Sequence, residues 1–336
     1  MKMHSDLKDK FTHALEMGLS MVVWRLPNDT TLSEMGPAKE MHWQGEASEN
    51  SSFIFAPFSN EMPAFCIGTA GREYHIQSDP EHPTSFDSVH YKDLVKRAIT
   101  NIQQGAFDKI VAARVIEERN PDFDITHHFS LLMDAHPNAF CYLWYSPSTG
   151  FWMGVSPELL VDRKGAKIRT VALAGTRSGS QGDFGSKEIE EQDLVVNFLE
   201  ETLSHFAITT ETAKKTKAQS GHLTHLKNEI NGRLKSDSES IYPLIQALHP
   251  TPAVAGLPKE KAIDFIAKEE GFSRSYYSGY LGLHSKTDSC LYVNLRCMQV
   301  LGQHQYIYVG AGLTGKSDPE AEWLETEEKA RIVRLR

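Results

Sequence analysis

Pairs of short apolar runs joined by tight turns are the feature that most constrains the fold of this chain. Two such pairs stand out: Ala139–Tyr145 with Phe151–Val155, and Leu159–Asp162 with Ile168–Leu173. The first pair is joined by the polar loop 146–150. Strands connected this closely must run antiparallel. The sequence therefore predicts antiparallel β-sheet rather than a doubly wound fold with a helix after every strand.

Helical periodicity comes in blocks along the chain. Apolar residues recur at intervals of three and four from Tyr91 to Ile102, and Gly105 closes this expected helix. Further helices are expected near 186–206, 240–248, 258–269 and 318–334, and further strands at 21–24, 52–57, 109–115, 290–295 and 306–310. This arrangement predicts the α+β class. The proline-rich stretch 78–83 suggests a division into a β-rich N-terminal portion, 1–84, packed on a main domain, 85–336.

Composition and charge exclude several classes of function. The chain has 336 residues, with 44 acidic against 35 basic side chains and a net charge of −9. An acidic balance without a basic run gives no electrostatic footprint for nucleic acid. No apolar run approaches the about 18 residues of a membrane span, and the N-terminus lacks the apolar segment of a signal peptide. We therefore expect a cytoplasmic protein in which any anionic substrate is attracted locally, by a metal or by a few placed cations.

Two pairs of glutamates suggest a metal site. Glu188 and Glu191 lie three residues apart near the start of one expected helix, and Glu322 and Glu325 lie three apart in the last one. This spacing places each pair on one helical face, and carboxylates from two converging helices suit Mg²⁺. Spacing alone favours an ordinary interpretation. Acidic side chains stabilise the first turn of any helix, and Glu325 with Lys329 has the spacing of a surface ion pair.

Lys109 and Glu158 are candidates for acid–base chemistry. Lys109 opens an apolar strand, and Glu158 follows another in Gly154-Val-Ser-Pro-Glu158. A lysine at a sheet end commonly extends its amine to solvent, whereas a buried neutral amine acts as a general base. A partly buried carboxyl group keeps its proton and acts as an acid. The residues alone leave both interpretations open.

Other motifs carry weaker signals. Gly175-Thr176-Arg177 and Gly310-Ala-Gly312 follow expected strands, where backbone amides either bind an oxyanion or simply form turns. His225 taken alone favours a structural role. No glycine-rich phosphate-binding pattern occurs between a strand and a helix, so the sequence does not support nucleotide binding.

Seven motifs occur together in the order seen in chorismate-utilising enzymes, and the resemblance runs from about residue 88 to the C-terminus. They are Phe107-Asp-Lys-Ile-Val-Ala-Ala-Arg114, Gly154-Val-Ser-Pro-Glu-Leu-Leu160, Ala172-Leu-Ala-Gly-Thr-Arg177, Leu248-His-Pro-Thr-Pro-Ala-Val-Ala-Gly-Leu-Pro258, Tyr277-Ser-Gly279, Asn294-Leu-Arg296, and Gly310-Ala-Gly312 with Glu325-Thr-Glu-Glu-Lys329. Within that family the chain resembles the isochorismate synthases.

The resemblance implies two large antiparallel sheets wrapped by helices, with a Mg²⁺-dependent site in a cleft. It implies that Glu191 and Glu325 bind the metal directly, with support from Glu188 and Glu322 through water, and that the metal binds the ring carboxylate of chorismate. It further implies that Arg296 and Tyr277 hold the enolpyruvyl carboxylate. The remaining pocket positions that match the family are Gly175, Thr176, His225, Gly312 and Lys329.

A few positions distinguish the subfamilies that the chain resembles. Ammonia-using relatives carry glutamine where this chain has Lys109, and a lysine there fits activation of water. Aminodeoxychorismate synthases use a covalent lysine at the place of Ala174, and salicylate synthases usually have threonine at the place of Ala253. These three positions agree on isochorismate as the product. One departure is Gln192, where the family commonly has histidine after the first metal carboxylate, and we expect it to modify metal affinity.

The expected reaction is therefore an isomerisation of chorismate in which Lys109 is the general base and Glu158 the general acid. The alternatives are a salicylate synthase and a non-catalytic chorismate-binding subunit. The sequence does not indicate whether the product enters menaquinone, siderophore or salicylate synthesis. We expect a monomer.

Overall fold

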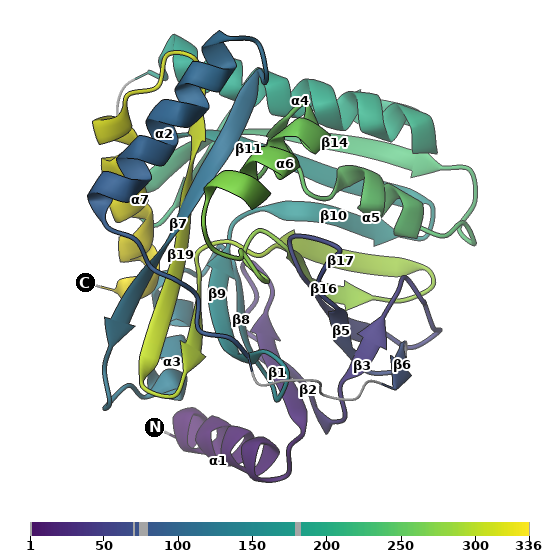
Figure 1. Cartoon of the computed structure of the whole chain (residues 1–336). Coiled ribbons are helices and arrows are strands. Elements are labelled where there is room, and N and C mark those ends of the chain that lie inside the picture. The colour runs from purple at the N-terminus through teal and green to yellow at the C-terminus, as the bar shows by residue number, and fades with distance from the viewer. Residues whose placement is uncertain (1, 70, 74–79, 179–182, 336) are drawn as a thin grey trace.

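The computed structural model describes residues 2–69, 71–73, 80–178 and 183–335. Two antiparallel sheets form its centre, and helices cover their outer faces (Figure 1). This architecture confirms the α+β class. Among the helices that the structure describes, none is long and apolar enough to cross a membrane.

The first sheet has eight strands in the described part of the chain, and it contains one of the two predicted hairpins, β8 with β9. In spatial order these strands are β15 (Gly256–Leu257), β7 (Lys109–Arg119), β19 (His304–Leu313), β18 (Cys297–Leu301), β9 (Gly150–Ser156), β8 (Phe140–Ser146), β1 (Ser20–Arg25) and β2 (Ser33–Ala38). Ser146 pairs with Gly150 across β8 and β9, so the connection is tighter than the loop 146–150 that the sequence suggests.

The second sheet has eleven strands within the described residues. In spatial order they are β12 (Ala207–Thr212), β14 (Leu223–Leu234), β11 (Lys167–Ser178), β10 (Leu159–Lys164), β17 (Asp288–Val293), β16 (Tyr280–His284), β4 (Ser52–Ala56), β5 (Ala64–Ile67), β3 (Met41–Trp43) and β6 (Arg72–Glu73), with β13 (Thr216–Ser220) beside β14. Of these strands, the sequence predicted β4, β10, β11 and β17.

Residues 1–84 supply strands to both sheets, since β1 pairs with β8 and β4 pairs with β16. The division at residue 84 stays a prediction. Part of its expected boundary, Ser78 and Asp79, lies outside the described residues.

Helices pack on the outer faces of the sheets. They are α1 (Lys2–Glu16), α2 (Ser88–Gln103), α3 (Ile125–Ala135), α4 (Ser186–Phe206), α5 (Tyr242–Leu248), α6 (Lys259–Glu269) and α7 (Pro319–Arg334). Five of these match expected helices, whereas α1 and α3 were not predicted. Asp87 begins α2 by accepting a hydrogen bond from the His90 amide, which is a typical N-cap.

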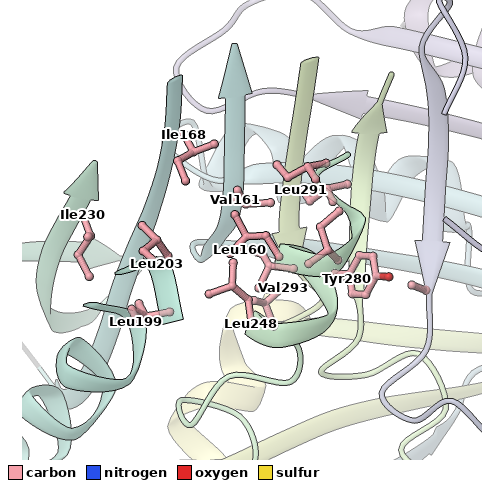
Figure 2. Packing of buried hydrophobic residues seen from close by; sticks show 14 of the residues in the cluster. Leu160, Val161, Ile168, Leu199, Leu203, Ile230, Leu248, Tyr280, Leu291 and Val293 are labelled. Atoms are coloured by element: carbon pink, nitrogen blue, oxygen red, sulfur yellow. The ribbon is translucent and has the colours of Figure 1, made fainter. Parts of the chain in front are cut away.

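An aromatic core joins the two sheets. Phe55 of β4 stacks on Trp144 of β8, with 4.9 Å between the ring centroids, and on Tyr276, with 4.5 Å. On the outer face of the second sheet, Leu199 and Leu203 of α4 pack with Ile168 and Ile230 (Figure 2). Burying side chains of this size stabilises a fold by about 1.5–3 kcal/mol each. This packing fixes α4 along β11 and β14, which matters for the site described next.

Candidate active site

A cavity lies where β7, β11, β14 and β19 meet the turn after β9 and the segment 251–254. Nine of the residues that the sequence singled out line it: Glu158, Thr176, Glu191, His225, Ala253, Tyr277, Arg296, Gly312 and Lys329. The other five, Lys109, Gly175, Glu188, Glu322 and Glu325, lie around this cavity without lining it. The structure thus gathers residues from seven separate motifs at one place.

Lys109 is fully buried behind the cavity wall. Its Nζ lies 2.9 Å from Glu191 Oε1, and its side chain has no exposed surface. The amine does not reach solvent, so the interpretation of a lysine that extends to the surface is wrong. Gly312 packs directly against this ion pair, because a Cβ at that position would collide with Glu191 Oε1. A glycine is therefore required there by the close approach of β19 to α4.

Glu191 is held as a carboxylate. Burial alone raises the pKa of a carboxyl group, but the charges of Lys109, Lys187 and Lys329 outweigh it and keep the pKa of Glu191 below its ordinary value. Its negative charge lines the cavity and lies among cations.

Glu158 lies in the turn between β9 and β10 and is 4% exposed. Burial raises its pKa to about 7, against the opposing charges of Lys109 and Arg296. Its Oε1 lies 3.5 Å from the hydroxyl of Thr251, at the outer limit of a hydrogen bond. A carboxyl group with this pKa retains its proton at neutral pH in part of the molecules, as a general acid must.

Arg296 and Tyr277 form one polar wall of the cavity. Arg296 has a φ of 48°, in the left-handed region, and its buried Nε has no hydrogen-bond partner. Strained backbone of this kind persists where the surroundings enforce it, commonly at functional sites. Burial raises the pKa of Tyr277 to about 12, so its hydroxyl remains a donor. The two side chains offer donors suited to a carboxylate.

Thr176 and His225 face each other across the paired strands β11 and β14. The Thr176 hydroxyl lies 3.2 Å from His225 Nδ1, while the buried Nε2 has no partner. Burial, together with Arg296 and Lys329, lowers the pKa of His225 well below its ordinary value. The imidazole is therefore neutral and presents a free ring nitrogen to the cavity.

Lys329 closes the cavity from α7. Its Nζ donates to the carbonyl of Gly310 at 2.8 Å and lies 2.6 Å from Glu325 Oε1. The ion pair that its spacing suggested is formed; Lys329 is buried, at 8% exposure, whereas Glu325 is partly exposed.

Lys187, which the sequence did not predict as a site residue, lies between the carboxylates of α4 and α7. Lys187 on α4 lies 2.5 Å from Glu322 Oε1 on α7, and its charge also acts on Glu191. Glu188 instead caps its own helix, with Oε2 accepting from the Gly185 amide at 2.8 Å. Within the described residues, no group of three or more metal-binding side chains lies together.

The donor set nevertheless fits a divalent cation. Glu322 is 1% exposed and its Oε2 has no hydrogen-bond partner. A buried acceptor without a partner, on which the charge of Glu325 also acts, is chemically suited to Mg²⁺, which prefers oxygen ligands. Lys187 could have been found from its place directly before Glu188, and Thr251 from the quoted motif that contains it.

A family model described as "Chorismate binding enzyme" matches residues 69–334. The chain belongs to this family. Isochorismate synthase MenF of Escherichia coli is 31% identical over 332 residues, which cover 94% of this chain and 74% of the relative. Isochorismate synthase DhbC of Bacillus subtilis is 29% identical, over 79% of this chain and 70% of the relative.

Solved structures give the same fold for this family member. The crystal structure of DhbC from Bacillus anthracis matches with a TM-score of 0.81 and 26% identity, over 96% of this chain and 98% of that chain. The structure of MenF from Escherichia coli matches with a TM-score of 0.78 at 22% identity, which concerns the fold alone. The resemblance to chorismate-utilising enzymes that the motifs suggested is confirmed.

Proposed function

We propose that this protein is an isochorismate synthase, an isomerase that moves the hydroxyl function of chorismate from C4 to C2. One observation carries the proposal: a buried carboxyl group with a pKa of about 7, Glu158, lies in one cavity with Arg296 and with the Lys109–Glu191 pair behind its wall. The names of relatives at about 30% identity support it.

In this proposal Lys109 is the general base. Its amine takes a proton from a water molecule, and the resulting hydroxide forms a bond to C2 of the ring. Only the neutral amine accepts a proton, so the ammonium of the Lys109–Glu191 pair first releases its extra proton to solvent, and the pair opens. The buried position of Lys109 excludes bulk water from this step.

Glu158 is the general acid that completes the exchange. As the C2–O bond forms, the ring double bonds shift and the C4–O bond breaks. Glu158 gives its proton to the departing hydroxyl group, which leaves as water. One water is consumed and one released, so the reaction is an isomerisation. Proton exchange with solvent then returns both side chains to their starting forms.

The other cavity residues bind and orient chorismate. Arg296 and Tyr277 hold the enolpyruvyl carboxylate, and His225 donates or accepts at a ring substituent with its free Nε2. Gly175, Thr176, Ala253, Gly312 and Lys329 shape the remainder of the pocket. Ala253 leaves room where a threonine would add a hydroxyl group, which supports isochorismate rather than salicylate as the product.

Mg²⁺ is the cofactor in this proposal. Glu191 and Glu325 would hold it directly, with Glu188 and Glu322 in support. When bound, it supplies positive charge that attracts the ring carboxylate of chorismate and stabilises charge developing there. A chain of net charge −9 needs such a local positive charge to attract an anionic substrate. A cytoplasmic location and a monomeric state belong to the same proposal.

Product identification tests the proposal. The purified protein is incubated with chorismate, with and without Mg²⁺, and the products are separated by chromatography. Isochorismate should form only with Mg²⁺, and salicylate and pyruvate should be absent. Release of pyruvate would indicate a salicylate synthase. Failure to consume chorismate with Mg²⁺ present would indicate a non-catalytic chorismate-binding subunit.

A further inference from the structure

Gln192 makes an unusually complete set of hydrogen bonds beneath the site. The residue is fully buried, and its Oε1 accepts from the Ala174 amide at 2.8 Å. Its Nε2 donates to the Ala172 carbonyl at 3.2 Å and to Asn228 Oδ1 at 3.0 Å. Both amide hydrogens and the amide oxygen are therefore used.

These partners belong to the part of β11 that forms the cavity wall. Leu173, Ala174 and Thr176 line the cavity, and the pairing of β11 with β14 shifts between Ala174 and Thr176. Gly175 fills this irregularity with a φ of +64°, and a Cβ there would lie 2.7 Å from the Glu188 carbonyl oxygen. The first turns of α4 thus rest directly on the irregular part of β11.

Two neighbouring side chains on α4, Glu191 and Gln192, point toward different parts of the structure. Glu191 points into the cavity toward Lys109, whereas Gln192 points onto the strand. Successive helical residues differ in direction by a fixed rotation, so fixing the side chain of Gln192 fixes where Glu191 enters. The close contact of Gly175 with Glu188 sets the distance between these turns of α4 and β11.

We propose that Gln192 is a positioning residue that locks the metal-binding turns of α4 to the substrate-binding part of β11. It acts on metal affinity through Glu191 and on substrate affinity through Thr176. The part of this proposal that concerns metal affinity rests on the proposed function, whereas the part that concerns the attachment of α4 to β11 does not.

The chemistry of the amide explains why glutamine suits this place. An imidazole has two ring nitrogens, so histidine at 192 satisfies at most two of the three partners. Leucine satisfies none and leaves the Ala174 amide and Asn228 Oδ1 without this partner. The ability to keep α4 in place therefore decreases from glutamine to histidine to leucine.

A matched pair of variants tests the proposal. Gln192→Leu removes the three bonds, and Gln299→Leu removes a comparable buried amide in the first sheet. Gln299 is 3% exposed, donates to the Thr149 carbonyl at 3.0 Å and accepts from the Tyr308 hydroxyl at 3.2 Å. Mg²⁺ affinity is measured by calorimetry without substrate, KM and kcat with chorismate, and amide hydrogen exchange over residues 172–176 and 186–195.

Gln192→Leu should weaken Mg²⁺ binding about tenfold or more, as the loss of groups that orient metal ligands commonly does. It should also raise the KM for chorismate and speed exchange in both segments, whereas Gln299→Leu should leave all of these unchanged. Gln192→His, a milder change if the leucine variant does not fold, should lie between wild type and Gln192→Leu.

Two outcomes would overturn the inference. One is amide hydrogen exchange over residues 186–195 that is as slow in Gln192→Leu as in the wild type. Where the leucine variant does not fold, Gln192→His is compared instead. The other is a Mg²⁺ affinity equal to that of the wild type in whichever of the two folds. If the wild type itself binds no Mg²⁺, the proposed function fails, and the exchange rates alone decide whether Gln192 locks α4 to β11.

Discussion

Replacing Glu158 by glutamine should change how stability depends on pH. The pKa of Glu158 is about 7 in the folded protein and 4.5 as its ordinary value. Between these two pH values the folded state binds more protons than the unfolded state, so the free energy of unfolding falls as pH rises. Each factor of ten in proton affinity corresponds to about 1.4 kcal/mol, so the loss amounts to about 3 kcal/mol. Glutamine cannot ionise, so Glu158→Gln avoids this loss.

Urea unfolding of the wild type and of Glu158→Gln from pH 4.5 to pH 8 measures the effect. The difference in free energy of unfolding should shift by about 3 kcal/mol in favour of glutamine across this range, because the contributions of all other titrating groups cancel. Glu201→Gln is the control, since Glu201 lies on the exposed face of α4, and its difference from wild type should stay constant.

The same substitution should lower turnover by about 10²–10⁴-fold, as removal of a general acid does. In the wild type, kcat/KM should decline as pH rises above about 7, where Glu158 loses its proton. A constant stability difference between wild type and Glu158→Gln, together with near-native turnover of the variant, would refute the reasoning.

Three further predictions concern the groups around Glu158. Lys109→Ala should lower turnover about 10²–10⁴-fold with the fold retained by circular dichroism; near-native turnover would exclude Lys109 as the base. Gly312→Ala places a Cβ against Glu191 Oε1 and should weaken Mg²⁺ binding about tenfold or more, whereas Gly315→Ala, with its nearest neighbour 3.7 Å away, should behave as wild type. Lys187→Met removes the partner of buried Glu322 and should cost up to about 3 kcal/mol of stability without Mg²⁺, whereas Lys316→Met, in an exposed pair with Glu190, should cost less than about 1 kcal/mol. Addition of Mg²⁺ should restore much of the loss in Lys187→Met, and a loss unaffected by Mg²⁺ would argue against a metal at Glu322.

Hydrophobic periodicity predicted the elements whose buried faces are apolar. The helix from Tyr91 and the hairpin of β8 and β9 were found because leucine, valine and aromatic side chains mark their faces. β14 was missed because its buried positions include Thr224, His225 and Asn228. His225 lines the cavity and Asn228 accepts a hydrogen bond from Gln192. Because these buried side chains are polar, the strand lacks the alternation of apolar residues by which a strand is predicted.

The residues of the site were predicted from motifs, but their pairing was not. Lys109 and Glu191 are distant in sequence, and the packing of α4 on β11, together with the pairing of β7 with β19, brings them together. Spacing left Glu188 open between a metal site and the first turn of a helix, and in the structure it caps α4. Local sequence does not determine which of several cations each carboxylate meets.

Turnover in water enriched in ¹⁸O tests most directly whether Lys109 and Glu158 exchange a hydroxyl group of chorismate with water. Mass spectrometry of the isochorismate formed with Mg²⁺ should show one ¹⁸O atom, located at C2, with none in unreacted chorismate. Isochorismate that contains no ¹⁸O would show that the C4 hydroxyl migrates without water, and would contradict the roles given to both side chains.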